Sequence, residues 1–370
     1  MKAVILVGGE GTRLRPLTLH RPKPMLPVVN RPFLEHVLAY LKSNGISDVI
    51  LSMGYKSDVI EKHFGDGSDF GVNLIYVVES SPLGTAGGVK NVEQYIDDTC
   101  FVFNGDILTD LDLQAMLKAH RSLNATVTIA LTPVENPSAY GLVLTEDQNR
   151  VTAFIEKPKP HRATTNLINA GTYILEKDVL ARIPPGEYYM FERELFPGLL
   201  KDGAPVFGYP SSAYWIDIGT PEKYLRVHRD VLDGAVLLEV QGVPAGDRIW
   251  IGRNCKISVS ARLTGPVVMG HGVVIEDEVE IVGPVVIDDG ARIGQASHVE
   301  DAVIWKAVSV GSRVELKGCV VAEGSRIGDD VSIVGGSVVA DGCVIGAGNK
   351  LAHGAKIWPQ KTLEPNAIAF

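Results

Sequence analysis

The chain has 370 residues, of which 45% are hydrophobic and 21% charged, and its formal net charge at pH 7 is −9. This length allows two domains with packed cores. The acidic balance argues against a nucleic-acid partner, because the wider field would repel a long polyanion. No apolar run approaches the ~20 residues of a membrane span and the N-terminus shows no cleavable signal pattern, so we expect a cytoplasmic protein without a membrane partner.

The four cysteines are isolated from one another and from histidine at any metal-binding spacing. We therefore predict neither a disulfide framework nor a zinc site, and we expect small buried hydrophobic side chains. The four are Cys100, Cys255, Cys319 and Cys343.

A short apolar run, Ala3 to Val7, leads into a glycine-rich turn. The run is too short for a helix and rich in β-branched residues, which predicts a buried strand of a parallel sheet. Gly8, Gly9 and Gly11 leave the backbone N–H groups unshielded, so that a ligand can contact the main chain. Such a turn suits a triphosphate.

Positive charge is concentrated just after this turn, at Arg13, Arg15, Arg21 and Lys23. In an acidic protein this grouping favours the binding of a small anion. The alternative is an ordinary surface turn with scattered basic residues. The spacing matches neither a Walker loop nor a dinucleotide fingerprint.

Strands and helices alternate along the first half of the chain, which predicts an α/β fold with a Rossmann-like, mostly parallel sheet and helices on both faces. Ligands of such sheets bind outside the carboxyl ends of the strands. The predicted helices are Phe33 to Ser43, Asp58 to Phe64 and Asn91 to Ile96, and the predicted strands are Asp48 to Met53, Leu74 to Val78, Cys100 to Phe103, Ala125 to Leu131, Leu142 to Leu144 and Val151 to Ile155.

The third strand runs into Glu79 and the segment PLGTAGG, in which Gly84, Gly87 and Gly88 remove side chains from the main chain. One glycine would normally suffice for a strand-to-helix turn, so this segment is a second candidate ligand-binding turn.

The fourth strand leads into NGD and places Asp106 at its end. A carboxylate at the end of a buried strand is costly to desolvate without a partner, and a divalent cation bound to phosphate oxygens would be one. The alternative is a helix cap, which Asp110 or Asp112 could also supply. A second candidate carboxylate, Asp217, lies just before a helix that Thr220 and Pro221 begin, and it could instead complete that capping region.

Pro158 ends the strand that begins at Val151, because proline cannot continue a sheet ladder, and presents Glu156 and Lys157 at its rim. From the residues alone, a solvated ion pair is the simpler interpretation of this pair.

From about residue 235 onwards, aromatic residues nearly vanish and an aliphatic residue recurs at every sixth position. This period predicts a hexapeptide β-helix with three short strands per coil. We therefore place an α/β domain at 1–234 and the β-helix at 235–370. The repeat positions are Ile251, Ile257, Leu263, Met269, Ile275, Ile281, Ile287, Ile293 and Val299, then Ile304, Val310 and Leu316, and finally Val321, Ile327, Ile333, Val339, Ile345, Leu351 and Ile357.

The β-helix could serve oligomerisation, because its flat outer faces stack readily, and we expect a homo-oligomer. A second possibility is an acyl-transfer site that uses His271, His298 or His353 as a base, although no long insertion loop is present to hold coenzyme A.

GGEGTRLRPLT followed by RPKPMLP closely resembles the signature of the sugar-nucleotidyltransferase family, also called nucleoside-diphosphate-sugar pyrophosphorylases. NGD, EKP, NAGTY and WIDIGTP match further motifs of the family in the same order. PLGTAGG is most similar to the nucleobase-binding segment of the guanylyltransferases that act on mannose 1-phosphate. The family's repeat domain is a left-handed β-helix.

The resemblance implies a role for each matching residue. Arg13, Lys23, Asp106 and Asp217 would be catalytic, and Asp106 and Asp217 would bind Mg²⁺. The sugar phosphate would contact Gly141, Glu156, Lys157 and Asn169. The nucleotide would contact Leu6, Gly8, Gly9, Gly11, Thr12, Arg13, Lys23, Glu79, Gly84 and Thr85.

These roles imply one reaction, in which a sugar 1-phosphate and a nucleoside triphosphate give a nucleoside-diphosphate sugar and pyrophosphate. GTP and mannose 1-phosphate are the favoured substrates. Glucose 1-phosphate with UTP or dTTP is the alternative, and so is a non-catalytic regulatory subunit with the same fold. The presence of Arg13, Lys23, Asp106, Lys157 and Asp217 argues for an active enzyme.

Overall fold

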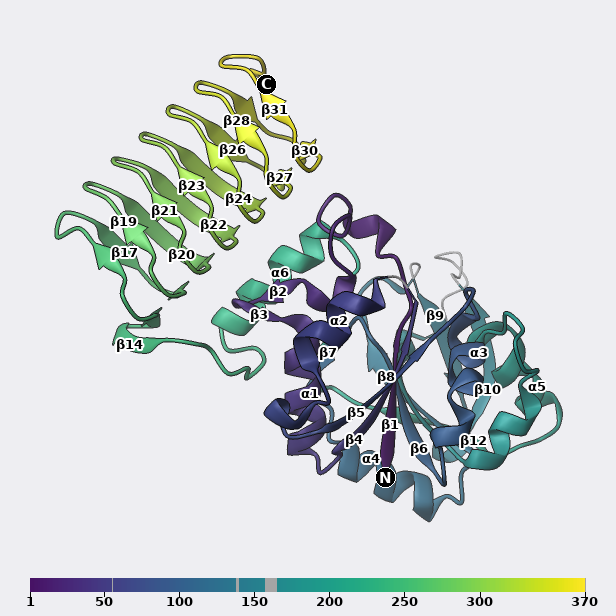
Figure 1. Cartoon of the computed structure of the whole chain (residues 1–370). Helices are drawn as coiled ribbons and strands as arrows, with labels where there is room; N and C mark the ends of the chain where they lie inside the picture. The colour runs from purple at the N-terminus through teal and green to yellow at the C-terminus, as the bar shows by residue number, and fades with distance from the viewer. Residues whose placement is uncertain (55, 138–139, 157–164, 370) are drawn as a thin grey trace. The chain divides into compact units, whose positions relative to one another are not determined.

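A computed structural model describes residues 1–54, 56–137, 140–156 and 165–369 of the chain (Figure 1). The chain forms two compact units, and each unit combines two stretches of sequence. The first unit contains Met1–Glu10 and Leu34–Asp217, and the second contains Gly11–Phe33 and Ile218–Phe370. The glycine-rich turn therefore contributes residues to both units.

The first unit is built on a nine-stranded sheet in which β5, β4, β1 and β6 are parallel to one another. Residues at the centre of β1 are fully buried, as the apolar run predicts. Five further strands complete the sheet: β11, β9 and β10 continue the path from β6, β8 pairs with β11, and β12 pairs with β8. The strands are β1 (Lys2–Val7), β4 (Asp48–Met53), β5 (Asn73–Val78), β6 (Cys100–Asn104), β8 (Val127–Pro133), β9 (Gly141–Thr145), β10 (Val151–Glu156), β11 (Leu167–Leu175) and β12 (Val206–Pro210).

The second half of this sheet is less parallel than the alternation of strands and helices predicts. β11 is antiparallel to β6, β8 and β9, and β9 is antiparallel to β10. No helix separates β9, β10 and β11 in the described residues, and strands without a crossover helix pair most easily as antiparallel neighbours. The parallel prediction holds for the four strands that carry the N-terminal motifs.

Helices cover both faces of the sheet, as predicted. Val102 of β6 packs in one core cluster with residues of α3 and α5, whereas Phe103 lines a small cavity with Val37 of α1. The helices of this unit are α1 (Phe33–Ser43), α2 (Ser57–Phe64), α3 (Gly84–Asn91), α4 (Leu113–Ser122) and α5 (Phe196–Lys201), and the shorter turns are η3 (Ser68–Phe70), η4 (Glu93–Tyr95), η6 (Asp147–Asn149), η8 (Lys177–Arg182) and the π-helix η9 (Phe191–Leu195).

The predicted helix over Asn91 to Ile96 is wrong in its position. The helix α3 begins earlier, at Gly84, because the backbone N–H groups of Ala86 and Gly87 both donate to the carbonyl of Tyr189 (3.0 Å each). That contact is distant in the sequence, so local periodicity could not show it. Glu93 to Tyr95 forms only the short turn η4.

The second unit contains a parallel β-helix, as the six-residue period predicts. Figure 1 shows its strands stacked in register from β17 to β31. All fourteen repeat positions from Ile275 to Leu351, and also Met269, lie in its buried core. Two steps of five residues, before Ile304 and before Val321, change the register partners from 18 to 17 residues apart.

The β-helix strands are short and bounded by turns. They are β14 (Val243–Gly246), β15 (Ile249–Ile251), β16 (Lys256–Ile257), β17 (Arg262–Thr264), β18 (Val267–Met269), β19 (Val274–Ile275), β20 (Glu280–Ile287), β21 (Arg292–Ile293), β22 (His298–Ile304), β23 (Ser309–Val310), β24 (Glu315–Val321), β25 (Arg326–Ile327), β26 (Ser332–Val334), β27 (Val338–Val339), β28 (Val344–Ile345), β29 (Lys350–Leu351), β30 (Lys356–Ile357) and β31 (Thr362–Leu363).

Three further parts complete the second unit. The turns η1 (Thr12–Leu14) and η2 (Lys23–Met25) precede a hairpin of β2 (Pro27–Val28) and β3 (Arg31–Pro32). The helix α6 (Pro221–Leu232) begins as predicted, because the side chain of Thr220 accepts the backbone N–H of Lys223. α6 packs against β20, β22 and β24.

All four cysteines are free thiols, and only Cys255 is partly exposed. Within the described residues, no helix combines the length and the apolar character that crossing a membrane requires.

Asp288, at a corner of the β-helix, carries a pH-dependent contribution to stability. Burial raises the pKa of this carboxyl from 3.8 to about 6. The contribution of this carboxyl to the free energy of unfolding is fully present below its pKa in the unfolded chain, near 3.8. It is lost as the pH rises through the folded-state pKa of about 6. We expect Asp288→Asn to melt a few degrees above the wild type at pH 8 and at the same temperature at pH 4, measured by circular dichroism.

Asp330→Asn is the matched control, because Asp330 is exposed and its pKa is lowered by Arg313. The same chemical change there should not raise the melting temperature at pH 8. A higher melting temperature for the wild type than for Asp288→Asn at pH 8 would contradict the raised pKa of Asp288.

Candidate active site

The four parallel strands deliver the N-terminal motifs to one edge of the sheet. β1 is followed by Gly8, β5 by Glu79 and β6 by Gly105 and Asp106. Because these strands run in the same direction, the residues that follow them lie at the same edge. The prediction that the motifs fall at carboxyl ends of strands is confirmed for these three.

The turn after β1 exposes its main chain. Gly9 is exposed, and a Cβ atom built on it would meet no atom within 4 Å among the described residues. Gly8 faces the carboxylate of Glu79, whose Oε1 lies 3.5 Å from where a Cβ of Gly8 would stand. The structure therefore brings together Gly8 and Glu79, two of the predicted nucleotide-binding residues.

The carboxylate of Glu79 is held by two donors from the protein. The hydroxyl of Ser52 donates to Oε1 (3.0 Å), and the backbone N–H of Leu83 donates to Oε2 (3.2 Å). An ionised carboxylate offers about four acceptor positions, so both oxygens retain acceptor capacity. Glu79 is thereby fixed in orientation while it remains able to accept further hydrogen bonds.

The glycines of PLGTAGG serve the packing of the protein as well as access for a ligand. A Cβ on Gly87 would stand 2.7 Å from the carbonyl oxygen of Glu187, and one on Gly88 would stand 2.9 Å from Glu79. Gly84 is packed as closely, since its Cβ would stand 2.7 Å from the carbonyl oxygen of Tyr189. Packing against the backbone therefore explains Gly84 and Gly87, and access for a ligand stays a prediction for all three glycines. Leu6 contacts the same region, 3.2 Å from a Cβ built on Gly88.

The two predicted metal ligands are brought together by a short antiparallel pair. β7 (Ile107–Thr109) pairs with β13 (Trp215–Asp217), and the register places Asp217 opposite Ile107. Asp106 is the residue just before Ile107, so the two carboxylates come from adjoining positions on neighbouring backbones. Their separation in the sequence is more than a hundred residues.

Asp217 is only 9% exposed, and the hydroxyl of Tyr140 donates to its Oδ1 (2.9 Å). The hydrogen bond from Tyr140 helps to orient this buried carboxylate, and Asp106 lies at an adjoining backbone position. Two carboxylates of this kind suit a hard divalent cation that has other oxygen ligands as well. In the described part of the chain, no three or more acidic, histidine or cysteine residues are grouped so that they could hold a metal by themselves. The binding of a metal by Asp106 and Asp217 stays a prediction.

Asn169 lies in an irregular stretch of β11. The register between β11 and β8 shifts between Asn169 and Tyr173, and Gly171 adopts a φ of 68° there. Asn169 Nδ2 donates to the hydroxyl of Tyr173 (2.8 Å), and its Oδ1 accepts the backbone N–H of Gly171 (2.9 Å). The bulge re-aims this side chain, as bulges near active sites commonly do.

The bulge is joined to the strand that carries Asp217. The indole N–H of Trp215 donates to the carbonyl of Ala170 (2.8 Å), and the Trp215 ring packs edge-on against Tyr140 at 5.5 Å between centroids. Gly141 follows Tyr140 directly and pairs with Glu156 of β10. The predicted sugar and metal segments are therefore neighbours in the first unit. Lys157 lies outside the described residues.

Glu192, on the π-helix η9, was not predicted as a site residue. Its Oε1 accepts from Asn169 Nδ2 (3.1 Å) and from the Tyr173 hydroxyl (3.2 Å), and its Oε2 lies 3.5 Å from the hydroxyl of Thr85. Burial, and then Glu192, raises the pKa of Tyr173 well above its usual value, which keeps Tyr173 a donor. Glu192 links a predicted nucleotide residue to a predicted sugar residue. Glu192 lies on a π-helix, a feature that is frequent at functional sites. Sequence periodicity does not show a π-helix, so this residue could not be found from the sequence.

The remaining predicted residues belong to the second unit. Gly11 adopts a left-handed φ of 62°, at which a side chain would be strained, and it begins the turn η1. Thr12 and Arg13 are exposed, whereas Lys23 is half-buried at the start of η2. Their placement beside Gly8 and Gly9 stays a prediction.

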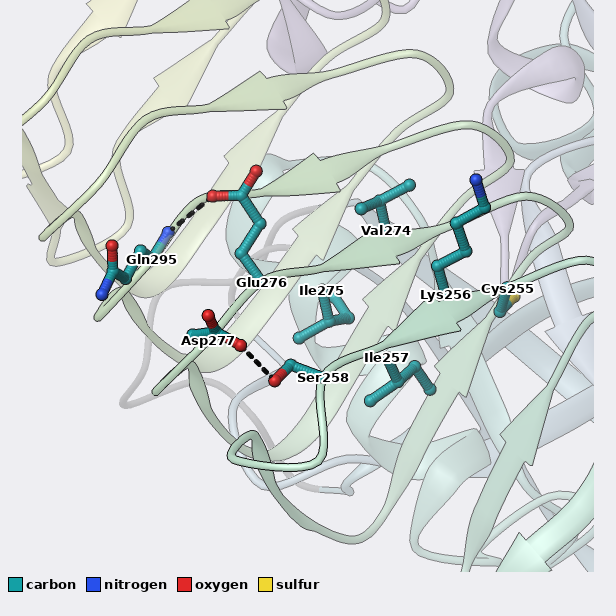
Figure 2. A pocket seen from close by; sticks show the side chains of 9 residues that line it. All are labelled: Cys255, Lys256, Ile257, Ser258, Val274, Ile275, Glu276, Asp277 and Gln295. Carbon is teal, nitrogen blue, oxygen red and sulfur yellow. Dashed lines mark hydrogen bonds between the residues drawn. The ribbon is translucent and has the colours of Figure 1, made fainter.

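The histidines proposed as alternative bases do not gather at the open depression of about 580 Å³ on the β-helix. Figure 2 shows the nine residues that line it, among them Lys256, Glu276 and Asp277, and no histidine is one of them. His298 instead lies between Glu280 (3.3 Å) and Glu300 (3.4 Å).

Residues 2–234 match the family model described as nucleotidyl transferase, and residues 247–351 match the model described as EIF2B subunit epsilon LbH domain, a left-handed β-helix. The predicted handedness of the β-helix is thereby confirmed.

Among curated proteins, the chain is 43% identical to a mannose-1-phosphate guanylyltransferase of Mycobacterium tuberculosis, over 80% of this chain and 82% of that protein. It is 35% identical to a UTP–glucose-1-phosphate uridylyltransferase of Synechocystis, over 85% of this chain and 86% of that protein. Among solved structures, HddC from Yersinia pseudotuberculosis complexed with GMP-PN is 33% identical, with a TM-score of 0.54, over 61% of this chain and 97% of that chain.

The family model covers more than half of the chain, and it spans the strand ends, the paired carboxylates and the bulged strand described above. On these grounds the chain belongs to the nucleotidyl transferase family.

Proposed function

We propose that this protein transfers a guanylyl group from GTP to mannose 1-phosphate and releases pyrophosphate. The observation that carries the choice of GTP is the oriented carboxylate of Glu79 at the end of β5. The M. tuberculosis relative is named for this reaction, and the Yersinia structure is a complex with GMP-PN.

An ionised carboxylate only accepts hydrogen bonds. Guanine presents two neighbouring donors, N1–H and the N2 amino group, which match the two oxygens of Glu79. Uracil and thymine present a single N–H between two carbonyl oxygens, and those oxygens would repel the carboxylate. Glu79 therefore favours guanine over either pyrimidine.

The chemistry requires two anions to meet. A phosphate oxygen of mannose 1-phosphate forms a bond to the α-phosphorus of GTP, and the bond from that phosphorus to the β-phosphate oxygen breaks, so that pyrophosphate leaves. No covalent enzyme intermediate is needed. The protein supplies position and positive charge, which is the main source of catalysis in such transfers.

Each group would make a separate contribution. The backbone of Gly8 and Gly9, with Arg13 and Lys23, would bind the triphosphate, and Asn169 and Glu156 would orient the sugar. Asp106 and Asp217 would hold Mg²⁺, which when bound stabilises charge on the phosphate oxygens. Lys157 would neutralise the attacking phosphate.

Glu79→Gln tests the choice of base. The amide replaces one acceptor by a donor, so one guanine donor is left facing an N–H group. We expect kcat/KM with GTP to fall by about 10- to 100-fold, and the ratio of UTP to GTP activity to rise. Pyrophosphate release across GTP, UTP, dTTP and ATP, each with mannose 1-phosphate and glucose 1-phosphate, is the measurement.

Wild-type turnover with UTP and glucose 1-phosphate but not with GTP and mannose 1-phosphate would overturn the substrate assignment in favour of uridylyl transfer. Equally low turnover in the wild type, Glu79→Gln and Arg13→Ala would favour the regulatory subunit.

Asp217→Asn tests the shared cation. Loss of one carboxylate should lower kcat by at least about 100-fold and raise the Mg²⁺ concentration for half-maximal activity, since the remaining ligands hold the ion more weakly. Mn²⁺ binding followed by electron paramagnetic resonance, with a GTP analogue present, provides a readout independent of turnover.

Asp112→Asn is the matched control. Asp112 caps α4 by accepting the backbone N–H of Ala115 (2.9 Å), and asparagine caps a helix equally well. Its activity and Mn²⁺ binding should equal those of the wild type. Unchanged metal dependence in Asp217→Asn would remove Asp217 from the metal site.

A further inference from the structure

The segment Gly11–Phe33 carries Arg13 and Lys23, yet it belongs to the same compact unit as the β-helix. Its own fold is tight around Gly11. The hydroxyl of Thr18 donates to the carbonyl of Gly11 (2.8 Å), and a Cβ on Gly11 would stand 3.4 Å from the Cβ of Lys23. Lys23 and the turn at Gly11 are therefore neighbours within this segment.

Arg21 attaches this segment to the β-helix. One amino nitrogen, Nη2, donates to Glu323 Oε2 (2.8 Å) and to Asp341 Oδ1 (3.1 Å). The guanidinium also lies over the ring of Trp305, 4.5 Å from its centroid. Trp305 is only 1% exposed, so this cation–π contact is shielded from water.

The three partners of Arg21 come from one corner of consecutive coils. Ile304, Val321 and Val339 are register partners in β22, β24 and β27, and each partner of Arg21 follows one of them within two residues. Coils at this corner are stacked by parallel backbone hydrogen bonds. Arg21 therefore contacts a rigid column of side chains, which limits its movement more than a loop would.

The next coil towards the N-terminus holds the hairpin β2–β3. Asn30 Nδ2 donates to the carbonyl of Ile287 (2.9 Å), and Ile287 is the register partner of Ile304. Val29, fully buried, has a φ of 46°, which a β-branched residue adopts only when its surroundings impose it. The backbone N–H of Val29 donates to His228 Nδ1 of α6 (3.3 Å).

The helix α6 joins both attachments. The hydroxyl of Tyr224 donates to the carbonyl of Pro27 and accepts the indole N–H of Trp305 (2.9 Å). Arg229 of the same helix pairs with Asp301 of β22. The segment, α6 and four consecutive coils thus form one network.

We propose that Arg21 is a positioning residue for nucleotide binding, through which the β-helix sets the placement of Arg13 and Lys23. Arg21 lies only two residues before Lys23, and its own charge is used by Glu323 and Asp341 rather than offered to a ligand. This inference rests on the proposed function, since it assigns the triphosphate to Arg13 and Lys23. It gives the β-helix a part in the chemistry of the catalytic half.

Arg21→Ala is the test. Without its attachment the segment samples more positions, so the KM for the nucleoside triphosphate should rise by about 10- to 100-fold while the KM for the sugar 1-phosphate changes less than about twofold. Arg21→Lys keeps the charge but loses the planar stacking on Trp305. Its KM for the nucleoside triphosphate should lie between those of the wild type and Arg21→Ala. Initial rates of the full-length protein provide these values.

Arg313→Ala is the matched control. Arg313 forms a bidentate pair with Asp330 between two coils. It is not one of the residues described above that hold the segment 11–33 to the coils. Its KM values should equal those of the wild type. Glu323→Gln and Asp341→Asn, which weaken the other side of the contact, should shift the KM in the same direction as Arg21→Ala.

Hydrogen–deuterium exchange of the protein without nucleotide provides the second measurement. Peptides within 11–33 should exchange faster in Arg21→Ala than in the wild type, while peptides of the β-helix core exchange at the same rate. Loss of protection throughout the second unit would indicate a merely structural role for Arg21 and would overturn the proposal.

An unchanged triphosphate KM in Arg21→Ala would also overturn it. If the wild type transfers no nucleotide to any sugar phosphate, the proposed function is wrong. The hydrogen–deuterium exchange measurement would then still decide whether Arg21 holds the segment 11–33 to the β-helix.

Discussion

The parallel pairing of β6, β1, β4 and β5 is the constraint on which the catalytic half depends. Parallel strands end at one edge, so the backbone after β1, the carboxylate after β5 and the acid after β6 meet there without further adjustment. Gly8 and Glu79, about seventy residues apart, become direct neighbours for this reason. The glycine turn and the charged side chains of Glu79 and Asp106 therefore share one edge of the sheet.

The antiparallel half of the sheet adds what the parallel half lacks. The bulge in β11 turns Asn169 out of the regular alternation, and Trp215 ties that bulge to the strand of Asp217. The segments predicted to bind the sugar and the metal are thereby joined by one set of hydrogen bonds. Tyr140 and Glu192 extend the set on either side, so the site is oriented by side chains that need not touch the reacting atoms.

The β-helix contributes through stiffness. Its coils repeat every 17 or 18 residues, and equivalent corners present a column of side chains. Arg21 and Asn30 both bind to that column, at successive coils. Attachment to this stacked scaffold offsets the entropy of ordering the segment 11–33. This accounts for the strained backbone at Val29, which the surrounding contacts impose.

The sequence by itself determined what depends on local or periodic patterns: the first strands, the start of α6 at Thr220, the six-residue repeat and the identity of the motif residues. Only the tertiary structure decided that Asp217 pairs beside Asp106, that the backbone of Glu187 packs against Gly87 and that Arg21 attaches to the coils of the β-helix. Local patterns reflect the energy of neighbouring residues and of a repeating face. Contacts between residues a hundred or more positions apart depend on how the strands and coils pair, which no window of sequence contains.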